Sequence, residues 1–209
     1  MDRRARTAQM QAYQRRAERR RNLLTIGTAV VLAVALVGSA VFFTYREQQK
    51  RADVEAATKA AAEAPIEGVQ DFPDLSRNHV TTAVDYPQDP PVGGDHAGVW
   101  TNCGTYTDPV EPTQGVHSLE HGAVWITYRP DLSPEQVEIL TQLAQTNSYA
   151  LLSPFEGLPS PVTASAWGMQ LAVDGATDPR LAAFLQKYAQ GPQMPEPGAA
   201  CTGGAGVTG

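Results

Sequence analysis

Basic residues are scarce in most of this sequence. The 209 residues include 16 Lys and Arg against 22 Asp and Glu, and the formal net charge is −6. Half of those cations are arginines within residues 1–22, so the remainder of the chain is strongly acidic. A nucleic-acid-binding surface needs a basic face. We therefore expect no nucleic acid among the partners of this protein.

Several well-known active-site motifs are also missing. The sequence has no P-loop and no dinucleotide-binding glycine fingerprint. Ser118, Ser153 and Ser165 are not set in the nucleophile-elbow pattern of serine hydrolases, and the loop acids lack the spacing of an EF-hand. These absences leave the question of an enzyme open and favour a role other than catalysis.

Cysteine is limited to Cys103 and Cys201. Outside the cytoplasm two thiols tend to pair. A bridge between these two would tie the C-terminal tail to the first third of the domain. The alternative is that Cys103 is a metal ligand. We expect the disulfide.

Charge and proline are absent from residues 23–43, which form one apolar run. A run of this length is about what a helix needs to cross the hydrocarbon core of a membrane. Eight arginines precede it within residues 1–22. This bias predicts a cytoplasmic N-terminus, a single-pass helix over 23–44 in contact with membrane lipid, and an extracytoplasmic remainder. A cleaved signal peptide is the competing interpretation, but the apolar run is long for one.

The segments after the apolar run differ in composition. Residues 45–65 are rich in Ala, Glu, Gln and Lys, and we expect a helical stalk that ends at Pro65. Residues 66–204 have the length of one globular domain. The glycine-containing residues 205–209 are expected to form a flexible tail.

Within the domain the two halves look different. The first half is loop-rich, since residues 85–115 are dense in proline and glycine. The second half alternates strand and helix patterns, and this order predicts the α+β class with an antiparallel-leaning sheet and two helices on one side. A split βαβ, ferredoxin-like unit would fit. The expected strands are 123–128, 149–154 and 162–173, and the helices begin near Pro134 and Pro179.

All four histidines lie within 43 residues, at positions 79, 96, 117 and 121. If His117-Ser-Leu-Glu-His121 is helical, its two imidazoles stand on one face, with Cβ atoms about 5–6 Å apart. If the segment is extended, they lie roughly 13 Å apart and cannot share an ion. Gly122 resembles a helix C-cap and favours the helical turn.

The leading hypothesis is a transition-metal site formed by His96, His117, Glu120 and His121, with copper or zinc as the metal. The sequence H-x-x-E-H also matches a metalloprotease motif. That chemistry needs a stable helix and a further acidic ligand, neither of which the sequence makes evident. The histidines are alternatively structural, packed among the neighbouring aromatic side chains. In that case the protein is a cell-envelope component without a metal, which contacts partners.

A further pattern extends over the domain and consists of His79, Tyr86-Pro87, Pro90-Pro91, Gly94-Asp95-His96, Trp100, Cys103-Gly104, Tyr106, the run Val116 to Gly122, and Pro195-Glu196-Pro197-Gly198 with Cys201. This pattern resembles the signature of the domain of unknown function 3105 family. The resemblance covers roughly residues 66–202 and implies a bacterial, mostly actinobacterial, extracytoplasmic domain on a single membrane anchor, with no established activity.

Overall fold

The structure is a computed structural model that describes residues 21, 27, 36, 38, 39, 41–53 and 64–206. The chain divides into two compact units, Met1–Ala60 and Ala61–Gly209. In the first unit, residues 41–53 are helical and exposed. This helix includes the first part of the predicted stalk.

Most of the predicted membrane helix, 23–44, lies outside the described residues, as does nearly all of the basic tail 1–22. Among the residues that are described, no helix combines the length and the apolar character needed to cross a membrane.

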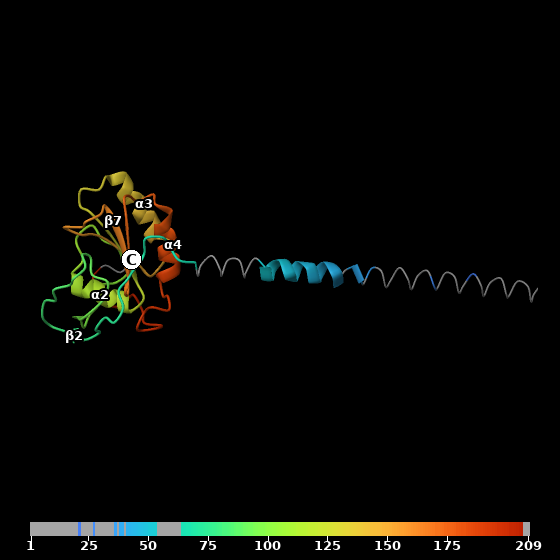
Figure 1. Ribbon diagram of the computed structural model, residues 1–209, viewed down its shortest axis with the longest axis horizontal. Coiled ribbons are helices and arrows are strands. Elements are labelled where there is room, and N and C mark those ends of the chain that lie inside the picture. Colours follow the sequence, from blue (N-terminus) through green and yellow to red (C-terminus); the bar gives the residue numbers. More distant parts are fainter. Residues whose placement is uncertain are drawn as a thin grey trace, which may run out of the picture. The chain divides into compact units, whose positions relative to one another are not determined.

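The second unit is built on a six-stranded mixed sheet (Figure 1). Its strand order is β1-β8-β7-β5-β6-β4, and a separate parallel pair is formed by β2 and β3. The strands are β1 Gln70–Asp71, β2 His79–Val80, β3 His96–Ala97, β4 Gly104–Thr105, β5 Val124–Tyr128, β6 Ala150–Pro154, β7 Val162–Ala166 and β8 Met169–Val173, and the helices are α2 Pro112–Glu120, α3 Pro134–Ala144 and α4 Pro179–Tyr188.

The centre of the sheet combines a crossover and a hairpin. Strands β5 and β6 are parallel and directly paired, with α3 as their connection, and β7 and β8 form an antiparallel hairpin that pairs with β5. The expected single strand 162–173 therefore turns back at Trp167-Gly168, where Gly168 has a φ of +70°. The split βαβ prediction was wrong, because no strand is inserted between β5 and β6.

One face of the sheet carries the larger core. Alternate residues of β5 point to opposite faces, and Val124 and Ile126 lie on the side covered by α3 and α4. Leu140 of α3 and Phe184 of α4 are completely buried there. This face matches the expected amphipathic helices.

The opposite face carries α2 over a smaller core (Figure 1). Val116 and Leu119 of α2 pack against Trp125 of β5, whose indole N–H donates to Ser153 Oγ at 3.0 Å. Gly115 permits this approach, since a Cβ there would lie 2.6 Å from the Trp125 ring. The two expected helices, α3 and α4, do lie on one side of the sheet. The sequence did not predict the third helix, which contains the histidine segment and covers the second face.

The C-terminal segment is fastened to the domain. Cys103 and Cys201 form the expected disulfide, with Cα atoms 5.3 Å apart. Beyond it, Ala205 bridges to Thr101, and Gly206 accepts a hydrogen bond from the Asn102 side chain. The chain is thus still paired two residues past the boundary expected at 204, and residues 207–209 lie outside the described part.

Candidate metal centre

The first two histidine ligand candidates come from the end of α2. His117 lies in the last turn, and His121 is the C-cap residue, whose backbone N–H still donates to His117 O. Gly122 then takes a φ of +94° and ends the helix. The helical alternative for this segment is therefore the correct one. The Nε2 atoms of His117 and His121 lie 3.0 Å apart.

The other two histidines come from the short parallel pair. In the register of β2 with β3, His79 lies directly opposite His96. The imidazole of His79 stacks on that of His117, with ring centroids 4.8 Å apart, and the His96 ring lies 4.9 Å from the same ring. The parallel pair thus places two more imidazoles against α2.

Glu196 reaches the same region from the C-terminal segment. Its carboxylate lies 3.4 Å from His121 Nε2, and its backbone N–H donates to Glu120 O at 3.3 Å. Four residues further on, Ala200 is followed by the disulfide-bonded Cys201, whose carbonyl accepts from Cys103 N at 2.8 Å. The disulfide therefore fixes the segment that carries Glu196.

Three of the imidazoles are held through their Nδ1 atoms. His96 Nδ1 lies 2.8 Å from Gly94 O, His117 Nδ1 lies 2.7 Å from Ala97 O, and His121 Nδ1 lies 2.8 Å from Ala200 O. A carbonyl oxygen can only accept, so each Nδ1 carries the proton and donates. The Nε2 atom of each neutral ring is then an unprotonated donor for a metal. Metal-binding histidines in proteins are oriented by hydrogen bonds of this kind.

The potential ligand atoms form two groups that overlap at His117. The first group contains His79, His96, His117 and Glu120, and its ligand atoms all lie within 4.8 Å of one another. Within it, Glu120 Oε2 is 2.9 Å from His96 Nε2 and 3.8 Å from His79 Nε2. The second group contains His117, His121 and Glu196, within the same limit. Both groups contain the donor types that bind first-row transition metals.

Comparison with known families matches most of this domain. A family model described as a protein of unknown function, DUF3105, matches residues 79–203. The chain belongs to this family. A second model, described as an inhibitor of host cell division protein domain, matches residues 1–59. No curated protein and no solved structure matches the chain.

Burial determines the charge state of His117 in the DUF3105 histidine cluster. The pKa of His117 is lowered to about 4, chiefly by burial and also by the neighbouring His121, His96 and His79, while the hydrogen bond to Ala97 acts in the opposite direction. The ring is therefore neutral near pH 7. Neutral imidazole is the form that binds a metal.

His96 has an unsatisfied nitrogen. Its side chain is 0% exposed, and although Nε2 lies 2.9 Å from Glu120 Oε2, it makes no hydrogen bond to any described residue. With Nδ1 already donating to Gly94, a proton or a metal ion on Nε2 would pair this buried nitrogen with the carboxylate.

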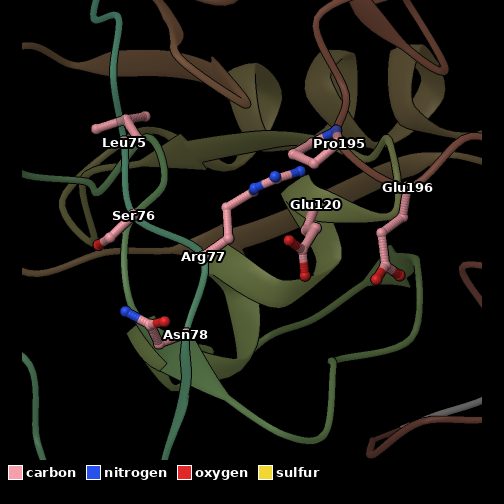
Figure 2. Close-up of a pocket in the computed structure, with 7 residues that line it drawn as sticks. All are labelled: Leu75, Ser76, Arg77, Asn78, Glu120, Pro195 and Glu196. Atoms are coloured by element: carbon pink, nitrogen blue, oxygen red, sulfur yellow. The ribbon is translucent and has the colours of Figure 1, made fainter.

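A solvent-accessible pocket of about 610 Å³ opens at the two carboxylates of the cluster. Glu120 and Glu196 both line it, and Figure 2 shows them projecting into it, with the Arg77 side chain extended toward Pro195. The Glu120 side chain is only 5% exposed, whereas that of Glu196 is 49% exposed. The pocket gives the buried donor atoms a route to solvent.

The predicted ligands are divided between the two groups. His96, His117 and Glu120 meet in the first, and His121 belongs to the second with His117. Sequence reasoning missed His79 and Glu196. His79 is one of the four clustered histidines, and Glu196 lies five residues before Cys201, whose pairing was expected. The sequence therefore contained a signal for each of these two residues as a candidate ligand. Cys103 is bound in the disulfide and is not a ligand.

Proposed function

We propose that this DUF3105 domain binds a transition metal ion, zinc or copper(II), at the histidine cluster. The observation that carries the proposal is the convergence of three imidazole ring nitrogens and one carboxylate oxygen, from His79, His96, His117 and Glu120, within 4.8 Å of one another. Two ligands of one tetrahedral zinc ion lie about 3.3 Å apart, given bonds of 2.0–2.1 Å. Small side-chain shifts therefore bring these donors to coordination distance.

The donor chemistry restricts the metal. Imidazole and carboxylate suit zinc and copper(II), whereas copper(I) prefers sulfur. Both cysteines are in the disulfide, so no thiolate is available. The orphaned Nε2 of buried His96 supports the same conclusion, because coordination to a metal would satisfy it.

We further propose that the domain lies outside the cytoplasm, on a membrane anchor formed by residues 23–44. The apolar run with arginines before it supports this orientation. The disulfide supports an oxidising compartment. Protease treatment of intact and permeabilised cells tests it. Digestion of the domain in intact cells is the expected result, and protection of the domain until permeabilisation would contradict the proposal.

Metal analysis of the full-length chain tests the binding function. The protein is purified in mild detergent without a polyhistidine tag, stripped with a chelator, loaded with Zn²⁺ or Cu²⁺, and freed of loose ions by gel filtration. We expect tightly bound metal. Glu120→Gln keeps the side-chain volume but removes the charge, and should weaken binding by more than the roughly 10–100-fold loss typical of outer-shell changes.

Glu156→Gln is the matched control, because Glu156 is an exposed acid in the loop after β6. It should bind metal as the wild type does. A structural role for the histidines predicts a different pattern: no bound metal at all, and Glu120→Gln affecting only thermal stability. That pattern would refute the metal-binding function.

A further inference from the structure

The cluster has more donor atoms than one ion needs. Four imidazoles and two carboxylates lie in contact, whereas zinc and copper sites in proteins use about four ligands. The two groups share only His117. Whether both groups can hold an ion at the same time depends on His117.

His117 has a single free donor. Its Nδ1 donates to Ala97 O at 2.7 Å, which leaves one lone pair, on Nε2. That lone pair can bind one ion. The first group without His117 still contains two imidazoles and a carboxylate, and the second group with His117 contains the same set.

The second group offers a place for a cation between His117 and His121. The Nδ1 atom of His121 donates to Ala200 O, and its Nε2 atom lies 3.0 Å from the Nε2 atom of His117. A proton on one of the two rings, or a metal ion between them, joins two nitrogens at that distance. Two ligands of one tetrahedral ion are separated by about 3.3 Å, close to the observed value. The carboxylate of Glu196, 3.4 Å from His121 Nε2, supplies the third donor.

We propose that the cluster holds two transition metal ions side by side, one on His79, His96 and Glu120 and the other on His117, His121 and Glu196. This inference rests on the metal-binding function proposed above. When only one ion is present, His117 completes the four-donor group. The second ion requires His117 to turn to His121, so it binds more weakly than the first.

The two ions would share one access route. Each set has one carboxylate in the same pocket, Glu120 for the first ion and Glu196 for the second (Figure 2). With three protein ligands each, both ions keep coordination positions open, as catalytic and substrate-binding metal sites do. An oxyanion or water entering the pocket can therefore contact both ions at once, as it does in two-metal sites.

Zinc titration of the stripped full-length protein tests the two-ion site. We expect two equivalents of zinc, the second bound more weakly. Glu196→Gln removes only a half-exposed carboxylate, so folding is preserved, and it should reduce the bound zinc to one equivalent. His121→Gln should do the same. Glu156→Gln, checked for folding by circular dichroism with the others, should retain two.

The outcomes separate the two proposals. One equivalent in the wild type overturns the two-ion site and leaves the metal-binding function intact, whereas no zinc overturns both. Two equivalents that persist in the Glu196→Gln, His121→Gln double variant overturn the assignment of the second set. Copper(II) gives an independent readout: two adjacent ions couple magnetically and lower the integrated electron paramagnetic resonance signal per copper, and two uncoupled signals contradict the arrangement.

Discussion

Removing the disulfide should destabilise the domain and also empty part of the metal centre. The perturbation is Cys103→Ser together with Cys201→Ser, which leaves no free thiol to bind metal. The bridge spans 98 residues. In the chain-entropy account, closing a loop of about 100 residues constrains the unfolded chain by about 4–5 kcal/mol. For a domain of this size, that corresponds to a fall in Tm of about 8–20 °C.

The effect on metal binding follows from the C-terminal segment that the disulfide holds in place. Cys201 lies next to Ala200, whose carbonyl orients His121, and five residues after Glu196. Without the bridge, this segment loses its position relative to α2. The first zinc ion, on His79, His96 and Glu120, takes no ligand from this segment, so stoichiometry should fall from two equivalents to one.

Calorimetric unfolding of the metal-free protein and zinc titration below its Tm measure the two effects separately. Wild-type protein in strong reductant serves as the control and should move toward the variant. If Tm falls by less than about 3 °C and two zinc ions still bind, the C-terminal segment is positioned by its other contacts. The role assigned to the disulfide is then refuted.

Three further changes test the fold and the electrostatics. Gly115→Ala places a Cβ 2.6 Å from the Trp125 ring. The variant should lose about 1–3 kcal/mol of unfolding free energy and bind zinc more weakly, because α2 must shift. An unchanged Tm would contradict this packing. Burial lowers the pKa of His117 to about 4, so as the pH falls this residue is protonated in the unfolded chain before it is protonated in the folded domain. Denaturant unfolding of the metal-free protein should therefore show a free energy of unfolding that falls by up to about 3 kcal/mol between pH 6.5 and 4. A fall of equal size in His117→Gln would exclude this residue as the cause. Asp178 caps α4 by accepting a hydrogen bond from Arg180 N at 2.9 Å. Asp178→Ala should therefore lower the free energy of unfolding by about 0.5–2 kcal/mol and leave the zinc stoichiometry unchanged. Loss of zinc would show that the two faces of the sheet are coupled.

The regular half of the domain could be predicted because its elements are long enough to show a pattern. Strand β5 is a continuous buried run of β-forming residues, and α3 has apolar residues at helical spacing. Each helix also begins with a proline in its first turn. The turn within 162–173 was not predicted. Residues 162–173 were predicted as one strand, and only the pairing of β7 with β8 distinguishes a hairpin.

The irregular half could not be predicted because its elements are too short to have a period. Strands β2 and β3 are two residues long, and nothing within two residues specifies a register. Yet that register is what places His79 opposite His96. Helix α2 had a signal in Pro112, but the surrounding density of proline and glycine obscured it. Glu196 depended on a long-range constraint, the disulfide, rather than on any local pattern.

The two faces of the sheet explain why the cluster is suited to a ligand. The α3–α4 face is closed by apolar side chains, so its burial is stable without further partners. The α2 face buries His96, His117, Glu120 and His121 instead. Burying such polar groups is costly unless their polar atoms are paired. Backbone carbonyls pair the outer nitrogens of three imidazoles, but the inner nitrogens face one another and a carboxylate. Under the proposed function, cations at the centre would satisfy these atoms together, and because the unfolded chain cannot bring them together, metal binding would contribute directly to folding. The short strands and the irregular C-terminal segment on this face would then be stabilised by the same ions that they position.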